Sequence, residues 1–273
     1  MLAMVTPVLV RRTSHGVTLL GDPNRPGGVT LAFTERTGGH STNEFSSLNL
    51  GLYCGDAEDV VRRNQRKALA ALGARHLSER LVNPVQVHGD TIVRIGKGGL
   101  DVASAQRAAL EGADAIVCNV PNVPVLLCYA DCVPVVLTAP GAFAVVHSGW
   151  RGTLLRIAGK ALAELCVAAQ CKATDVNAYI GPHIGAADYE VSPELAGRFV
   201  EEFGDSVVCE PQNLDLGAAV RRALIDQELP EESVAEVCDS TAHSTHRFYS
   251  YRAEGGACGR HGALACILSS NEK

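Results

Sequence analysis

The sequence contains few residues that could complete a copper redox centre. Its 273 residues include two methionines, Met1 and Met4, so the weak axial methionine of a blue-copper site has no candidate away from the terminus. Multicopper centres further need His-x-His pairs, and none occurs among the nine histidines. Genuine oxidase chemistry is therefore disfavoured, although copper would still bind adventitiously to a single site of His and Cys ligands.

Disulfide, secretory and membrane signals are also missing. The ten cysteines include no Cys-x-x-Cys pair, and their scatter along a long chain indicates reduced thiols. In the first sixteen residues an apolar stretch precedes the arginine pair Arg11-Arg12, the reverse of the order in a signal peptide. No segment reaches the roughly 20 apolar residues that a membrane helix needs. We therefore expect a cytoplasmic protein without a membrane partner.

Positive charge is scarce and dispersed. Lys and Arg number 24 against 30 Asp and Glu, giving a formal net charge of -6, and basic residues form no run longer than a pair. Nucleic acid is therefore not an expected partner, although one cleft can still carry a basic pocket for phosphate. Internal repeats and low-complexity tracts are absent too, so we expect one domain over residues 1–273.

The order of apolar patterns predicts a mixed α/β fold. Short β-prone runs and turn residues fill 27–56, and a helix is predicted over 56–74. Buried strands are predicted within 81–95, 113–119 and 123–139, with a polar linker between the first two. A strand that stops at His147 is expected to turn into a helix over 153–169. Two more amphipathic helices are predicted later, within 192–204 and 214–230.

Three segments place a metal-capable side chain in a loop or at a strand end: QVHG with His88, ADC with Cys132 and HSGWRG with His147. Two imidazoles and a thiolate form a ligand set that zinc uses, and three protein ligands leave a fourth position for water or substrate. Because these residues are far apart along the chain, only the fold can bring them together.

A series of ordered motifs that spans nearly the entire chain resembles the laccase-domain family, which is also called the purine nucleoside phosphorylase or peptidoglycan-editing-factor family. The motifs are long and specific, so chance is a poor explanation. They are FTERTGGHS, SLNLG, GDAEDVVRRNQ, VNPVQVHG, GADAIVCN, YADCVPVVL, AVVHSGWRGT, YIGPHIGAADYEV, RFYSYR and GR.

The resemblance implies a four-layer α/β/β/α sandwich with mixed sheets and one zinc ion held by His88, Cys132 and His147. It also implies phosphorolysis of adenosine, inosine, guanosine or methylthioadenosine, and deamination of adenosine. Purine nucleosides and phosphate are thus the expected small-molecule partners, of a monomer or a dimer. Two segments depart from the family pattern and bear on substrate preference: His183 in IGPHIG, where many relatives have cysteine, and CDSTAHSTHRFYSYRAEGG.

Several polar residues near these motifs are candidates for binding substrate. Arg151 in GWRG and Arg36 in FTERTGG are predicted to bind phosphate, because a guanidinium fork matches an oxyanion, although each would also suit a surface ion pair. Asp131 is predicted to orient a ligand imidazole or to act as a base, and otherwise to form a turn. Asn49 in SLNLG is predicted to contact ribose or phosphate, and otherwise to support its loop.

Three other functions compete with a nucleoside phosphorylase. Cys132 activated by His147 would suit a cysteine hydrolase that edits peptidoglycan precursors. A copper-dependent polyphenol oxidase is the second competitor, and a binding module without catalysis is the third. The zinc deaminase signature H-x-E with P-C-x-x-C is absent, so any deamination must use a different site design.

Overall fold

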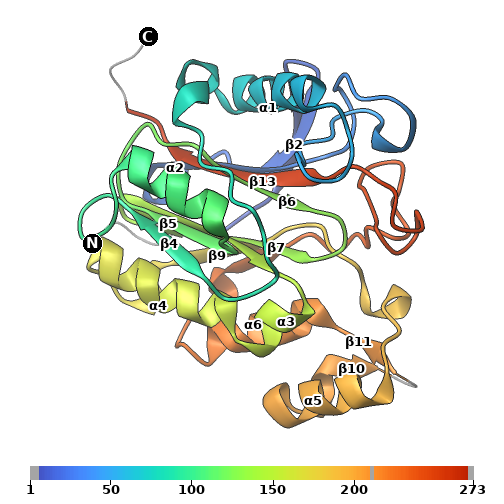
Figure 1. Ribbon diagram of the computed structural model, residues 1–273. Coiled ribbons are helices and arrows are strands. Elements are labelled where there is room, and N and C mark those ends of the chain that lie inside the picture. Colours follow the sequence, from blue (N-terminus) through green and yellow to red (C-terminus); the bar gives the residue numbers. More distant parts are fainter. Residues whose placement is uncertain (1–5, 210–211, 270–273) are drawn as a thin grey trace.

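Two β-sheets packed against each other form the centre of the protein (Figure 1). The computed structural model describes residues 6–209 and 212–269. The first sheet has the strand order β1 (Val10–Ser14), β2 (Val17–Gly21), β3 (Val29–Thr34), β13 (His261–Ile267) and β6 (Val125–Tyr129). The second has the order β12 (Val234–Glu236), β9 (Asn177–Ile180), β7 (Val133–Ala139), β8 (Ala142–Ser148), β5 (Ala115–Cys118) and β4 (Ile92–Ile95). A separate pair joins β10 (Val208–Cys209) to β11 (Asn213–Leu214).

The second sheet is mixed, and the first is antiparallel apart from one parallel bridge between Val82 and Val125. In the second sheet β4 pairs with β5 and β9 with β12 in parallel, whereas β7 pairs with β8 antiparallel over its whole length. Every residue of β7 and β8 is buried. Their unbroken apolar runs are typical of strands covered on both faces.

Three apolar cores separate the layers. Side chains alternate along β8, so Ala144 and Val146 face an outer core while Phe143 and Val145 face the core between the sheets. Tyr129 of β6 also crosses this inner layer, since its hydroxyl donates to the Val146 carbonyl at 2.9 Å. A third core lies on the outer face of the first sheet.

Helices cover the outer face of each sheet (Figure 1). On the first sheet lies α1 (Glu58–Leu72), within the predicted range 56–74, and Gly73 after its last residue takes the left-handed conformation. The outer core of the second sheet contains residues of α4 (Ile157–Ala169), α5 (Pro193–Phe203) and α6 (Leu216–Ile225), with α3 (Trp150–Leu154) packed against them. The predicted four-layer α/β/β/α arrangement is confirmed. Short 3-10 helices span Pro26–Gly28, Asn43–Phe45, Arg75–Arg80, Ala173–Asp175, Ala186–Asp188, Asp205–Val207 and Glu231–Ser233.

Two predicted segments differ from the structure. The linker predicted between the first two buried strands contains α2 (Val102–Glu111), which begins at Asp101, whose carboxylate accepts the Ser104 N–H. The residues that it buries are the alanines Ala105 and Ala109, so no large apolar side chain marks this face in the sequence. The helix predicted over 153–169 is two helices, because Arg156 takes a left-handed conformation between α3 and α4.

All ten cysteines are free, in agreement with the absence of paired spacing. Among the described residues, no helix has both the length and the apolar character needed to cross a bilayer.

Candidate metal centre and its cavity

His88, Cys132 and His147 meet at one end of the second sheet. His147 is the second-last residue of β8, and Cys132 directly precedes β7, whose first residue Val133 pairs with Ser148. His88 comes from the loop that leads to β4. The possible ligand atoms of the three residues all lie within 4.8 Å of one another, close enough to share one ion. The fold therefore brings the predicted ligand set together.

A buried carboxylate, Asp114, holds both histidines. One oxygen accepts from His147 Nδ1 at 2.8 Å and from the His88 backbone N–H at 3.0 Å, and the other accepts from the Gly89 N–H at 2.7 Å and the Val87 N–H at 3.3 Å. Because a carboxylate only accepts, Nδ1 of His147 carries a proton, and Nε2 is the ring nitrogen left to face a metal. The same oxygens fix the loop in which His88 takes a φ of 59°.

Gly149 closes the centre on the side of α3. A Cβ atom added there would lie 3.1 Å from both Cys132 Sγ and His88 Cδ2. This is closer than ordinary van der Waals contact, so the two ligands can approach only because this position has no side chain. The close packing of Cys132 and His88 therefore accounts for a glycine at this position of the HSGWRG motif.

The charges of the centre favour a thiolate. Burial, the largest single influence, raises the pKa of Cys132, but the charge of His147 and hydrogen bonds from His147 and His88 outweigh it and leave the pKa lowered. Burial lowers the pKa of His147, yet Cys132 and Asp114 together raise it above the ordinary value. The side chains therefore provide an anionic sulfur and two imidazoles, the donor set of a soft divalent metal.

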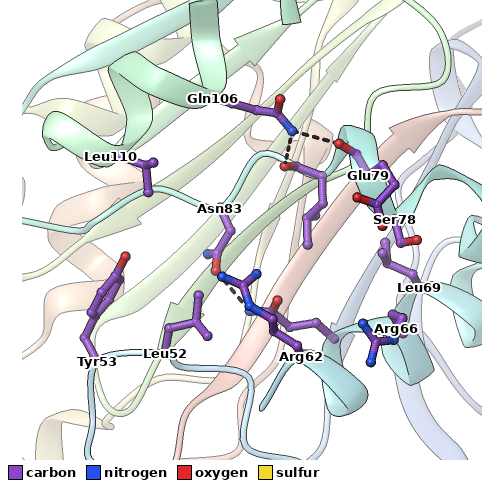
Figure 2. A pocket seen from close by; sticks show the side chains of 12 residues that line it. Leu52, Tyr53, Arg62, Arg66, Leu69, Ser78, Glu79, Asn83, Gln106 and Leu110 are labelled. Atoms are coloured by element: carbon purple, nitrogen blue, oxygen red, sulfur yellow. Dashed lines mark hydrogen bonds between the residues drawn. The ribbon is translucent and has the colours of Figure 1, made fainter. Parts of the chain in front are cut away.

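The centre opens into a cavity of about 620 Å³, a size typical of small-molecule sites. His88 is exposed and Cys132 half-buried, whereas His147 is buried. A shallower hollow adjoins this cavity and shares Leu52, Tyr53 and Asn83 with it (Figure 2). The cavity is lined by Gly51, Leu52, Tyr53, Cys54, Asn83, Pro84, Gln86, His88, Cys128, Tyr129, Ala130, Asp131, Cys132, His147, Trp150, Tyr189, Tyr251, Arg252 and Arg260.

Comparison with known proteins identifies the family of this chain. The model of a family described as multi-copper polyphenol oxidoreductase laccase matches residues 30–268. The chain belongs to this family. A relative from Bacteroides thetaiotaomicron, named purine nucleoside phosphorylase, is 34% identical to this chain over 239 residues, which are 83% of this chain and 87% of the relative. A protein named adenosine deaminase RL5, from an unknown prokaryotic organism, is 33% identical over 247 residues, 85% of this chain and 92% of that relative.

A solved structure extends the likeness to the fold. The crystal structure of YlmD from Geobacillus stearothermophilus matches with a TM-score of 0.84 at 28% sequence identity, and the match covers 96% of this chain and 100% of that chain. The family resemblance inferred from the motifs is therefore confirmed.

The metal-capable residues do not extend to a larger cluster. Within 6–209 and 212–269, the only group of three or more His, Cys, Asp or Glu residues close enough to share a metal is His88, Cys132 and His147. Met1 and Met4 lie outside the described residues. The part of the chain that the structure describes thus offers one candidate metal site.

Two of the predicted substrate residues lie away from this cavity. Arg151 is exposed on α3, with its guanidinium 4.7 Å from the centre of the Trp150 ring, and it lines a separate surface hollow. Arg36 packs over Tyr249 at 4.1 Å and pairs with Glu254 at 2.9 Å. Its Nε and Nη1 also donate to three backbone carbonyls, so much of the guanidinium is bonded within the fold.

The other two polar candidates lie close to the cavity but bond to the chain. Asn49 is fully buried, and its oxygen accepts the Arg260 backbone N–H at 2.8 Å. Asp131, which precedes Cys132, accepts from the Thr241 hydroxyl and from the Arg252 N–H, each at 2.7 Å. The acceptor that orients the His147 ring is Asp114 rather than Asp131.

Sequence reasoning did not single out Asp114, Arg252 or Arg260. All three lie within motifs that carried the family resemblance, GADAIVCN, RFYSYR and GR, so their signal was present. What the sequence could not reveal is that β5 places Asp114 beside His147, whose backbone N–H donates to the Asp114 carbonyl at 2.7 Å.

Proposed function

We propose that this protein is a zinc-dependent purine nucleoside phosphorylase that acts on adenosine, inosine, guanosine and methylthioadenosine and also deaminates adenosine. The observation that carries the proposal is the convergence of Cys132, His88 and His147 in a cavity of small-molecule size, with Asp114 directing one imidazole. The names of the relatives support the choice of substrate class, since several are called purine nucleoside phosphorylase and one adenosine deaminase.

The residues fit zinc better than a harder ion. Zinc takes sulfur and imidazole nitrogen together, and sites that catalyse keep three protein ligands with one position open. His88 and His147 would hold the ion through ring nitrogens and Cys132 through its thiolate. A zinc ion bound there would polarise a phosphate oxygen or lower the pKa of a bound water. His88 is exposed and lines the cavity, so a reactant in the cavity would lie beside the ligand set.

The cavity walls suit a nucleoside. In phosphorolysis an oxygen of phosphate bonds to the anomeric carbon of ribose as the bond from that carbon to the base breaks. The bonding electrons stay on the base nitrogen, which takes up the proton brought by hydrogen phosphate. Trp150, Tyr189 and Tyr251 offer aromatic surfaces to a purine. These groups would orient the two reactants and exclude water from the reacting carbon.

One observation favours a second candidate, a cysteine hydrolase that edits peptidoglycan precursors. Cys132 and His147 shift each other's pKa toward a thiolate and an imidazolium, which is also the state of a cysteine nucleophile. The two functions differ in their need for metal. A thiolate bound to zinc resists alkylation until the metal is removed, whereas a free nucleophile reacts in the protein as purified.

The test is an incubation of metal-quantified protein with adenosine, inosine and methylthioadenosine, with and without phosphate, followed by chromatography. We expect His88→Ala and Cys132→Ala to abolish product formation and stoichiometric zinc together, whereas His246→Ala, an exposed histidine outside the cavity, retains both. Iodoacetamide labelling of Cys132, read by peptide mass spectrometry, should require chelation. Full activity of metal-free protein would favour the hydrolase instead.

A further inference from the structure

Two guanidinium groups that line the cavity, those of Arg252 and Arg260, form no salt bridge with a carboxylate of the described residues. Arg260 Nη1 donates to the carbonyls of Cys258 at 2.6 Å and Gly259 at 2.9 Å, while Arg252 donates from Nη1 and Nη2 to the Glu190 carbonyl at 3.2 Å. Nε and Nη2 of Arg260 have no acceptor among the residues that the structure describes. Each guanidinium therefore lines the cavity with N–H donors that the described residues leave unused.

Buried polar groups fix the backbone of each arginine. Asn49 accepts the Arg260 N–H, and the Leu50 N–H donates to the Arg260 carbonyl at 2.9 Å. Gly51 leaves room for the stem of Arg260, whose Cγ lies 2.7 Å from where a Cβ of residue 51 would stand. The SLNLG and GR motifs are thus parts of one arrangement, although they lie at opposite ends of the sequence.

Arg252 is held in a comparable way next to the metal ligands. Asp131 bonds its backbone N–H, and the guanidinium lies 5.1 Å from the centre of the Tyr189 ring. Asp131 itself immediately precedes Cys132 in the chain. Asn49, predicted to contact ribose or phosphate, and Asp131, predicted to orient a ligand imidazole or to act as a base, are thus placed to act through the two arginines as positioning residues.

We propose that Arg252 and Arg260 form a subsite for the oxygens of a phosphate group in the cavity that holds His88, Cys132 and His147. A guanidinium fork binds phosphate oxygens in pairs, and two such forks balance a charge of about -2. Fixed donors lose little freedom when the anion binds. This inference rests on the proposed function, because phosphate is the second reactant of phosphorolysis.

The two arginines predicted from sequence motifs compete poorly for this role. Arg36 is committed to Glu254 and to backbone carbonyls, and Arg151 lines a different hollow. The structure therefore assigns the phosphate to Arg252, the last residue of the RFYSYR motif, and to Arg260 of the GR motif.

The test compares Arg260→Gln, Arg260→Lys and Arg252→Gln with Arg198→Gln, a control on the exposed face of α5. In zinc-loaded protein, we expect Arg260→Gln to raise the dissociation constant of inorganic phosphate, measured by calorimetry, about tenfold to a hundredfold. The KM for phosphate should rise by the same factor and much more than the KM for the nucleoside. Arg260→Lys should fall between, because it keeps the charge but loses the fork, and the control should match the wild type.

Two further arms make the outcome decisive. Titration with a nucleoside 5′-monophosphate tests whether the subsite takes a phosphate carried by the substrate. If Arg260→Gln weakens that ligand and not free phosphate, the subsite stands with a different source. Phosphate binding that Arg260→Gln and Arg252→Gln leave unchanged, or that only Arg151→Gln weakens, would overturn the proposal. Because binding is read without turnover, a wild type that binds phosphate but converts no nucleoside would refute the phosphorylase function alone.

Discussion

Replacing Asp114 with asparagine tests whether this carboxylate prepares the metal centre. The carboxylate accepts four hydrogen bonds, two at each oxygen, and an amide can accept at only one of its two ends. In either orientation two buried or half-buried donors lose their acceptor. At about 1–3 kcal/mol for each orphaned donor, the free energy of unfolding should fall by about 2–6 kcal/mol.

The zinc affinity of the folded Asp114→Asn variant should also fall, as an effect separate from the loss of stability. If the amide NH₂ faces His147, the proton of that ring moves to Nε2 and the ligand lone pair is lost. Loss of such an outer partner typically lowers metal affinity about 10- to 100-fold. Urea unfolding gives the stability, and competition with a chromophoric chelator gives the zinc affinity of the folded protein.

Asp131→Asn is the matched control, because it makes the same change in a second buried acid of the cavity wall. Asp131 bonds Thr241 and Arg252 but neither histidine, so its variant should lose stability while its zinc affinity stays within about threefold of the wild type. The reasoning fails if Asp114→Asn folds and binds zinc as the wild type does. It fails equally if both variants lose zinc to the same extent.

Two more predictions follow from packing and charge. Gly149→Ala should weaken zinc binding and lower stability by about 1–3 kcal/mol, because the new methyl group presses on the Cys132 sulfur; a chelator competition and a melting curve would reveal a variant that is instead neutral. Burial raises the pKa of Glu35, but hydrogen bonds and charge from Arg11 and Arg247 outweigh it and leave the pKa lowered. The contribution of ionised Glu35 to the free energy of unfolding is therefore complete above its ordinary pKa of about 4.3 and is lost as the pH falls through the lowered pKa of the folded protein. Urea unfolding at a series of acidic pH values should show that Glu35→Gln makes the free energy of unfolding fall less steeply with decreasing pH.

The sequence was sufficient where a residue's role is marked by a long local pattern. The unbroken apolar runs of β7 and β8 and the amphipathic period of α1 identify these elements without any tertiary information. By contrast, α2 buries only the small side chains of Ala105 and Ala109, so its buried face lacks the large apolar residues that mark a core-facing helix in a sequence.

The residues of the site also differ in how far the sequence reveals their roles. The metal-capable residues carry their chemistry in the side chain, so motifs pointed to them directly. For arginine and asparagine the side chain alone does not decide between binding a ligand and holding the fold. Arg36 and Arg260 both lie in family motifs, yet only contacts between distant segments show that Arg36 is bonded to Glu254 while Arg260 faces the cavity.

The cavity draws its two sets of groups from different sheets. Cys132 and His147 belong to the second sheet, whereas Arg260 directly precedes β13 of the first. Packed sheets stand about 10 Å apart, and the side chains between them determine that spacing. The inner apolar layer, with Tyr129 bridging to Val146, is therefore a spacer that sets how far the arginine stands from the sulfur and imidazoles. A change of volume deep in that layer, remote from any reactant, alters the reach between the two halves of the site as well as the stability of the fold.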